Sequence, residues 1–143
     1  MRPQLPDYGT FTHWPDGGRA LIHPDDMLIA TEVVPSSRVL KRSRFDGIFY
    51  HFHYGPDLFF RIRPCMWLKL DWEGFDVGDQ VEVSGLGMVR EPFIARITEM
   101  RFAKRSRRIE YSLDQAGKFQ PRTYLADELI QLTNKARLRD QRS

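Results

Sequence analysis

Two histidines and two arginines in the first half of the chain have residue types and a spacing suited to binding a small ligand. His51 and His53 are two positions apart, so in a strand both side chains project from the same face. They could ligate a metal, but zinc needs three or four ligands, and the nearby cations Arg61 and Arg63 disfavour it. Two guanidinium groups suit phosphate or carboxylate better. For this His/Arg face we prefer an ordinary exposed sheet surface, then an anion site, then a metal site.

Two clusters of cations in the second half could bind a larger anion. The first contains Arg101, Lys104, Arg105, Arg107 and Arg108 and lies between two strand-like segments, so it is predicted to form a hairpin tip. The second is in the tail and contains Lys135, Arg137, Arg139 and Arg142. Basic loops neutralise phosphates and bind nucleic acid in a salt-dependent way. Because no aromatic residue alternates with the arginines to stack on bases, we prefer a solvated loop and helix end, with nucleic-acid binding as the alternative.

Little else in the sequence suggests catalysis. Asp25 and Asp26 resemble a catalytic pair, but acidic residues in a first helical turn usually have a capping role. Cys65 is better explained by core packing than as a nucleophile. The sequence has no Gly-rich phosphate loop, nucleophile elbow, paired cysteine motif or His-Glu-x-x-His pattern. We therefore expect no catalytic residue and no cofactor, and an enzyme that uses the His/Arg face is the second alternative.

The His/Arg face must be positioned by a hairpin. Residues 48–54 and 58–63 read as two strands joined by a turn at Gly55-Pro56-Asp57. If Phe52 lies opposite Phe60, then Tyr50 meets Ile62 on the apolar face. The same register brings His51 near Arg61 on the other face, and Phe49 near Arg63.

The segments before the hairpin are a predicted arm and a predicted helix. Residues 1–21 contain three prolines and three glycines and read as an irregular arm, pinned to the body by Phe11 and Trp14. Pro24 fits the first position of a helix. Apolar residues continue at helical spacing from Met27, and Pro35 ends the run.

The second half reads as a small β domain. A Gly78-Asp79 turn precedes a short strand, residues 93–102 and 109–113 form longer ones, and a turn at residues 115–118 follows. Asp127 and Glu128 are predicted to open a terminal helix whose apolar stripe contains Leu129, Leu132 and Ala136.

Composition limits the general class of protein. The chain has 143 residues, 41% hydrophobic and 29% charged, which is close to globular averages and makes wholesale disorder improbable. The net charge of +3 lies entirely in residues 75–143. One cysteine cannot form an internal disulfide, and no apolar run is long enough for a signal peptide or membrane span, so we expect a cytoplasmic protein without a membrane.

The sequence resembles two known groups of proteins. One part of the chain, about residues 75–132, resembles KOW and Tudor modules of the SH3-like barrel class through Gly78-Asp79-x-Val81, Ala95-x-Ile97, Tyr111-x-Leu113, Tyr124 and Glu128-Leu129. Trp14-Pro15, Ile22-His23-Pro24-Asp25-Asp26, Val34-Pro35-Ser36-Ser37-Arg38-Val39 and Arg63-Pro64-x-x-Trp67 resemble a family of small, uncharacterised bacterial proteins, over nearly the whole chain. The second resemblance implies an unknown function and transfers no site residue.

Tudor modules bind methylated Lys or Arg in an aromatic cage. Phe93, Phe102, Tyr111 and Tyr124 supply aromatics, but core packing explains them better. Gly85, Gly87 and Met88 occupy the loop where a cage wall is expected, and this loop has no aromatic residue.

The predicted fold is therefore α+β and mainly β. Residues 1–74 form an arm, helix and hairpin, residues 75–132 an SH3-like small barrel with a short C-terminal helix, and residues 133–143 a basic tail. We expect Trp67, Leu68, Leu70 and Trp72 to pack between the halves and make one cooperative unit. The expected function is a non-enzymatic binding module with an unknown partner, a protein being favoured over nucleic acid.

Overall fold

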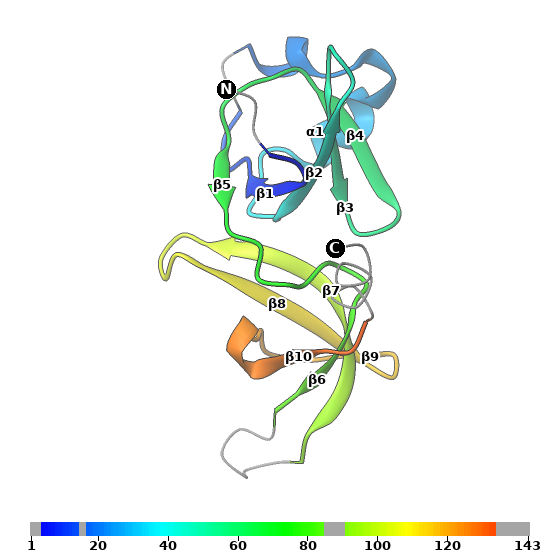
Figure 1. Ribbon diagram of the computed structural model, residues 1–143, viewed down its shortest axis with the longest axis vertical. Coiled ribbons are helices and arrows are strands. Elements are labelled where there is room, and N and C mark those ends of the chain that lie inside the picture. The colour runs from blue at the N-terminus through cyan, green and yellow to red at the C-terminus, as the bar shows by residue number, and fades with distance from the viewer. Residues whose placement is uncertain (1–3, 15–16, 85–90, 134–143) are drawn as a thin grey trace. The chain divides into compact units, whose positions relative to one another are not determined.

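The protein consists of two compact units, each with one five-stranded antiparallel sheet (Figure 1). The computed structural model describes residues 4–14, 17–84 and 91–133. Unit 1 comprises residues 1–73 and 101–107, and unit 2 comprises residues 74–100 and 108–143. The prediction of a mainly β protein is confirmed.

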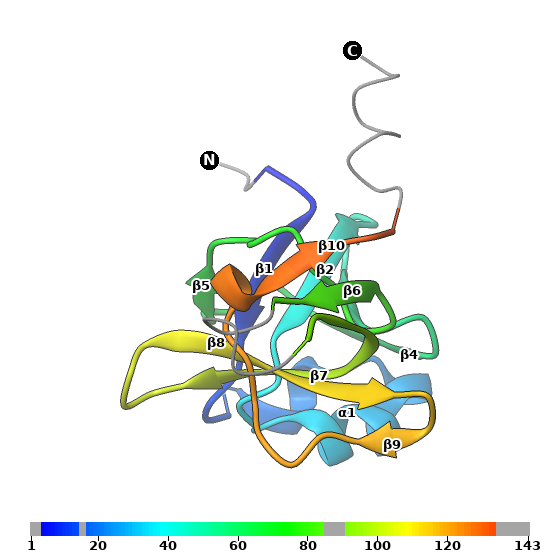
Figure 2. The same cartoon turned by 90° about the horizontal axis from the view of Figure 1, so that it is seen from below.

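Unit 1 contains five strands in the order β4-β3-β2-β1-β5. Their bounds are β1 Asp7–Thr10, β2 Leu40–Phe45, β3 Tyr50–Tyr54, β4 Leu58–Ile62 and β5 Leu68–Leu70. The predicted hairpin is β3 and β4, and its register is confirmed, with Phe52 opposite Phe60 and His51 opposite Arg61. Strand β5 lies at one edge of the sheet beside β1, as Figure 2 shows.

The predicted helix covers one face of this sheet. A 3-10 helix, Gly18–Leu21, precedes a second one, Pro24–Asp26, which continues into α1, Met27–Val33. The side chain of His23, not a carboxylate, caps this start by accepting a hydrogen bond from the backbone N–H of Asp25. The apolar side of α1 contributes to the core of unit 1 with Phe11, Ile22, Leu40, Phe52, Phe60 and Ile62.

The prediction of an irregular N-terminal arm is wrong, because residues 7–10 form β1 in the interior of the sheet. All four residues of β1 are buried. Asp7 lies opposite Arg42 and accepts two hydrogen bonds from its guanidinium group, at 2.9 Å and 2.6 Å. Gly9 lies so close to β5 that a Cβ atom would be 2.5 Å from the carbonyl oxygen of Leu68 and 2.8 Å from the Trp67 ring. Long-range contacts therefore outweigh the local effect of the prolines.

Unit 2 contains the sheet β10-β6-β7-β8-β9. Its strands are β6 Gln80–Val83, β7 Phe93–Ala103, β8 Arg108–Gln115, β9 Lys118–Phe119 and β10 Leu129–Gln131. Strands β6 to β9 follow one another as a meander, and β10 returns to pair with β6. The buried apolar residues are Phe75, Val81, Val83, Ala95, Ile97, Met100, Ile109, Tyr111, Leu113, Tyr124 and Leu129.

Both predicted turns of unit 2 are present. Gly78 has a positive φ of 97°, and Asp79 accepts hydrogen bonds from the backbone N–H of Asp76 and from the side chain of Gln131. Ala116 and Gly117 also have positive φ and join β8 to β9. The long strand β7 buries Ala95 and Ile97 but then Met100, so the buried positions change parity near its centre.

Two details of the predicted C-terminal part are wrong. The pairings of the described residues make an open sheet, not a closed barrel. Asp127 and Glu128 belong to a single 3-10 turn, Ala126–Glu128, and Leu129 starts β10 instead of a helix. Strand β6 pairs with this segment in antiparallel fashion, with Leu129 opposite Val83. This pairing outweighs the helical spacing of apolar residues in the sequence. Ala136 lies outside the described residues.

Candidate functional site

On the His/Arg face, Arg61 is already paired with a carboxylate. Its guanidinium donates to Asp26 at 2.7 Å and 3.1 Å, and its backbone N–H donates to the same carboxylate at 2.8 Å. Burial raises the pKa of Asp26, but the hydrogen bonds and charge of Arg61 outweigh it and hold that pKa below its usual value. These hydrogen bonds connect β4 to Asp26, the residue directly before α1.

His51 has a carboxylate partner as well. Its Nε2 lies 2.8 Å from Oδ2 of Asp46, and its ring packs on Phe59. The pKa of Asp46 is lowered by hydrogen bonds from the backbone N–H of Phe49, from His51 and from the backbone N–H of Ile48. His51 is also 8% exposed, so it is less accessible than an ordinary residue of a sheet surface.

His53 contacts a serine placed by a β-bulge. The register of β2 against β3 shifts between Arg42 and Arg44, and Ser43 is the extra residue. Its Oγ lies 2.8 Å from Nε2 of His53. Burial, followed by the charges of Lys41 and His51, lowers the pKa of His53 and favours the neutral ring.

Arg63 completes the His/Arg face and lies 5.2 Å from the centre of the Phe49 ring, as predicted from the register. The structure thus places His51, His53 and Arg61 on the paired strands β3 and β4, and Arg63 directly follows β4. Asp26 and Asp46 lie beside Arg61 and His51. These carboxylates reduce the positive charge that an anion would meet, and the anion site stays a prediction. Among the described residues, no group of three or more His, Cys, Asp or Glu side chains could hold a metal.

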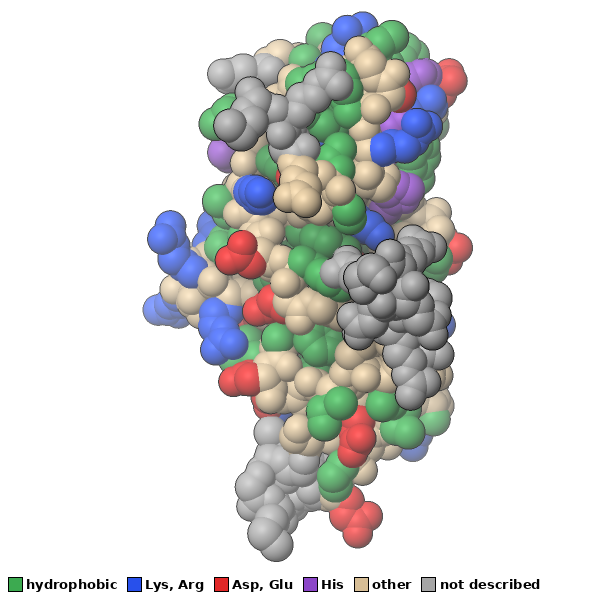
Figure 3. All heavy atoms as spheres, viewed as in Figure 1, with side chains coloured by type: hydrophobic (Ala, Val, Ile, Leu, Met, Phe, Trp, Pro, Cys, Tyr) green, Lys and Arg blue, Asp and Glu red, His purple; other side chains and the backbone are tan. Residues whose placement is uncertain are grey.

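The first basic cluster lies at a hairpin tip, as predicted. Residues 104–107 form the turn between β7 and β8, and Arg107 has a φ of 58°. Figure 3 shows cationic side chains gathered over this turn. Lys104, Arg105 and Arg107 are exposed, and none has a carboxylate partner among the described residues.

The two ends of the cluster have other contacts. The guanidinium of Arg101 donates to the Ser37 hydroxyl at 3.2 Å, and the backbone of Arg101 forms an isolated antiparallel β-bridge with that of Arg38. Arg108 lies 3.9 Å from Asp127, with both side chains largely exposed. The tail cations Lys135, Arg137, Arg139 and Arg142 lie outside the described residues.

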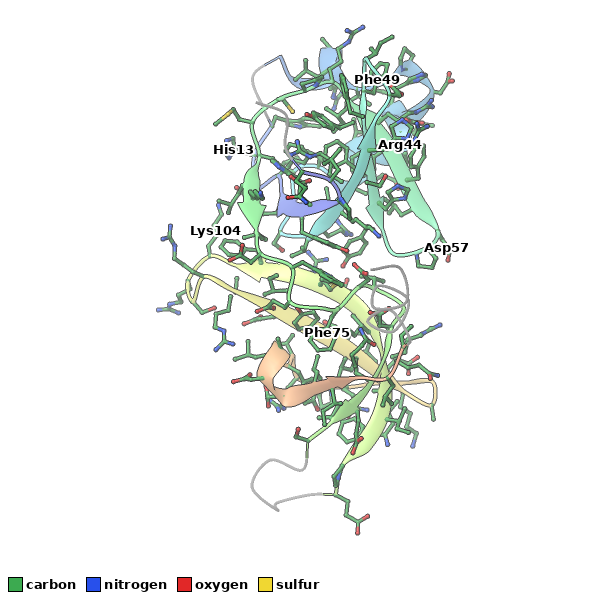
Figure 4. All side chains as sticks on the ribbon, viewed as in Figure 1. His13, Arg44, Phe49, Asp57, Phe75 and Lys104 are labelled. Atoms are coloured by element: carbon green, nitrogen blue, oxygen red, sulfur yellow. The ribbon has the colours of Figure 1, made fainter. Side chains whose placement is uncertain are left out.

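Two hollows meet at Leu68, and we call their combined lining the Leu68 surface. The first has a volume of about 260 Å³ and a mainly apolar wall that includes Phe11, Met66 and Trp67. The second, about 500 Å³, is lined by Leu68, Phe102, Lys104 and Arg107. All of these residues belong to unit 1. In Figure 4, His13 of the first hollow is labelled above β5 and Lys104 of the second is labelled below it.

The Leu68 surface contains features that the sequence analysis missed. Met66 is 88% exposed and Leu68 is 45% exposed, although Leu68 was expected to pack between the halves of the chain. Phe102 lines a hollow together with two cations of the hairpin tip. The sequence had been interpreted as having no aromatic residue in this cluster that could stack on a base. The sequence offered a signal, because Phe102 is only two positions before Lys104.

Two of the four aromatic residues considered for a Tudor-like cage are core residues. Tyr111 and Tyr124 are almost fully buried, and they contact Phe75 and Phe93 respectively in edge-on geometry. Residues Gly85, Gly87 and Met88 of the expected cage wall lie outside the described residues.

Cys65 is half-buried against the core of unit 1, as predicted. Burial raises the pKa of its thiol to about 11, and the nearby Arg42 offsets only part of that effect. The thiol is therefore protonated at neutral pH and is a poor nucleophile.

Comparison with known proteins gives a family and no function. The model described as Family of unknown function (DUF6960) matches residues 1–130. The chain belongs to this family. The resemblance to an uncharacterised family is thereby confirmed, while the DUF6960 assignment transfers no site residue. No curated protein and no solved structure matches the chain.

None of the described helices has the length and apolar character needed to cross a bilayer.

Proposed function

We propose that this protein is a non-enzymatic binding module that recognises an anionic partner through the Leu68 surface. One observation carries the proposal: Leu68, which is exposed, and Phe102, which is partly buried, line the same hollow as two cations. These cations, Lys104 and Arg107, have no carboxylate partner among the described residues. An apolar wall next to uncompensated cations suits a ligand with both apolar and negatively charged groups. On the His/Arg face, by contrast, Asp26 and Asp46 lie beside Arg61 and His51.

For unit 2 we propose a relationship to the SH3-like class, in which binding is the common role. The support is its meander of β6 to β9, with β10 returning to pair with β6 after a 3-10 turn. Fold analogy alone is a weak argument for function, so the proposal of binding rests on the Leu68 surface. A reducing, cytoplasmic location is supported by the single cysteine.

The proposal is tested by fluorescence anisotropy at about 50 and 200 mM salt, a range over which phosphate-driven affinity falls steeply. The probes are labelled single-stranded RNA, labelled single-stranded DNA and a labelled glutamate-rich peptide. We expect at least one probe to bind, and the variant Lys104→Glu/Arg107→Glu to weaken binding by about tenfold or more. The matched control is Arg105→Glu, which changes an exposed cation of the same turn that does not line the hollow. Failure of every probe to bind at low salt, or equal binding by all variants, would contradict the proposal.

A second candidate function is binding of single-stranded nucleic acid at the same surface. The observation in its favour is Phe102, because an aromatic ring beside two cations can stack on a base while the cations neutralise phosphates. This candidate predicts that log affinity falls with log salt at a slope of about −0.7 for each phosphate contacted on a single strand. A response to salt no larger for the RNA than for the peptide would reject it.

A further inference from the structure

Strand β5 offers a free edge at the Leu68 surface. It ends the strand order β4-β3-β2-β1-β5, so only β1 pairs with it among the described strands. An edge strand presents a row of backbone N–H and C=O groups to which another extended chain can bind. Leu68 and Lys69 are both exposed on this strand.

Two hollows that share Leu68 supply two different subsites beside this strand. The hollow of about 260 Å³ beside Met66 and Trp67 is mainly apolar and has room for an aliphatic or aromatic side chain. The hollow beside Lys104 and Arg107 has positive charge over an apolar floor made by Leu68 and Phe102. Since Leu68 lines both hollows, one extended segment can reach both.

We propose that the partner is an extended acidic peptide that adds to β5 as a further strand, with an apolar side chain in the first hollow and a carboxylate facing Lys104 and Arg107. This inference rests on the proposed function and specifies its ligand. Strand addition obtains affinity from main-chain hydrogen bonds and specificity from alternate side chains. Side chains two positions apart in a strand are about 6.6 Å from each other on the same face, so a short peptide can use both subsites.

Charge and backbone chemistry favour this partner over two others. A second copy of the chain that paired through β5 would bring two Lys69 side chains to the same short edge, where like charges repel. A nucleic acid could use the cations and Phe102, but it has no peptide groups to complete the hydrogen bonds of a sheet edge. An acidic peptide in strand conformation can pair its carboxylates with the cations and its main chain with the edge of β5.

The test uses the full chain and three labelled ten-residue peptides in anisotropy titrations. The first alternates leucine or valine with glutamate, the second replaces glutamate with lysine, and the third keeps the acidic composition but has proline at every second position. Proline removes the N–H donors that strand pairing requires. Labelled single-stranded DNA is measured in parallel.

We expect the alternating acidic peptide to bind, and the lysine and proline peptides to bind at least about tenfold more weakly. Leu68→Glu should lower the affinity for the acidic peptide by about tenfold, because it adds a negative charge to the wall that the two hollows share. Arg105→Glu should change this affinity less than twofold. Retained circular dichroism shows that the variants are folded. Leu68→Gln supplies a neutral comparison at the same position.

Three outcomes would overturn the inference. Equal binding of the acidic and proline peptides, both weakened by Lys104→Glu/Arg107→Glu, would exclude strand addition while leaving the proposed anion-binding function in place. Binding of the DNA alone, with the same sensitivity to these substitutions, would assign the surface to nucleic acid. Absence of binding by all four probes would reject the inference and the proposed function together.

Discussion

The Asp7–Arg42 ion pair shows how single residues hold unit 1 together. Both side chains are less than 10% exposed, and the guanidinium also lies over the rings of Tyr50 and Trp67 at 4.2 Å and 4.7 Å. Removing one member of a buried pair leaves the other charge without compensation. We predict that Asp7→Ala lowers the free energy of unfolding by about 3–5 kcal/mol, measured by urea denaturation.

The double variant Asp7→Leu/Arg42→Met is the control for this prediction. It removes both charges and fills the same space with apolar groups, so it should be clearly more stable than Asp7→Ala. If the double variant lost at least as much stability as the single one, uncompensated charge would not be the cause.

His53 gives a prediction about pH. Its pKa in the folded protein is lowered, chiefly by burial, so the unfolded chain binds a proton more readily than the folded one. The neutral, buried His53 therefore contributes its full stability above the pKa of the unfolded chain, about 6.5, and this contribution decreases as the pH falls below that value. We predict that between pH 7.5 and 5.5 the wild type loses more unfolding free energy than His53→Gln. Equal losses in urea titrations at the two pH values would contradict this account of His53.

At the scale of elements, Gly9 determines whether β1 can lie against β5. A methyl group there would be 2.5 Å from the Leu68 carbonyl oxygen, and backbone cannot move aside as a flexible side chain can. We predict that Gly9→Ala destabilises the protein by about 1–3 kcal/mol, as overpacking does, and changes the near-ultraviolet circular dichroism of Trp67.

Gly18→Ala is the comparison for Gly9→Ala, because a Cβ atom at residue 18 would contact nothing within 4 Å. It should carry only the strain of a positive φ, without any change in the spectrum of Trp67. An unchanged thermal midpoint and spectrum for Gly9→Ala would show that the close approach of β1 and β5 is not required.

The elements differ in how far the sequence could predict them. The β3–β4 hairpin was predicted with its register, because Phe52, Phe60 and the turn at Gly55 all specify the same pairing. Strand β1 was missed because its evidence is non-local: the partner of Asp7 is Arg42, and the strand beside Gly9 is about 60 residues away in sequence. Strand β10 was mistaken for a helix because Leu129 and Leu132 are three positions apart, which fits the helical period. Pairing with β6, which no local pattern contains, makes the segment a strand, and Leu129 is buried while Leu132 is exposed.

The candidate sites differ in the same way. The position of the basic cluster at a hairpin tip followed from the flanking strand patterns, and the structure confirms it. The carboxylate partners Asp26 and Asp46 of the His/Arg face could not be assigned from spacing, since Asp26 is 35 positions from Arg61. The Leu68 surface joins β5 to residues 102–107, a proximity that no local pattern contains.

At the scale of the whole molecule, chain connectivity links the two units. Residues 101–107 belong to unit 1, whereas the remainder of the β7–β8 hairpin belongs to unit 2, so the chain passes between the units at residues 73–74, 100–101 and 107–108. Cutting the chain before Phe75 therefore removes Ser37, to which Arg101 and Phe102 donate hydrogen bonds. We predict that the full chain unfolds in one transition and that a fragment of residues 75–143 is less stable.

Thermal unfolding followed by circular dichroism and calorimetry checks this prediction. The reciprocal fragment, residues 1–74, lacks residues 101–107 and should also be destabilised. Cooperative melting of residues 75–143 at the temperature of the full chain would instead establish an independent C-terminal domain.

The central claim is that the Leu68 surface is the binding site, and nuclear magnetic resonance tests its location most directly. Backbone amide shifts of the ¹⁵N-labelled full chain would be followed as the alternating acidic peptide is added. We predict concentration-dependent shifts at residues 66–70 and 102–107, with smaller changes at His51, His53 and Arg61. Shifts concentrated on those three residues or within unit 2, or no shifts at all, would contradict the claim.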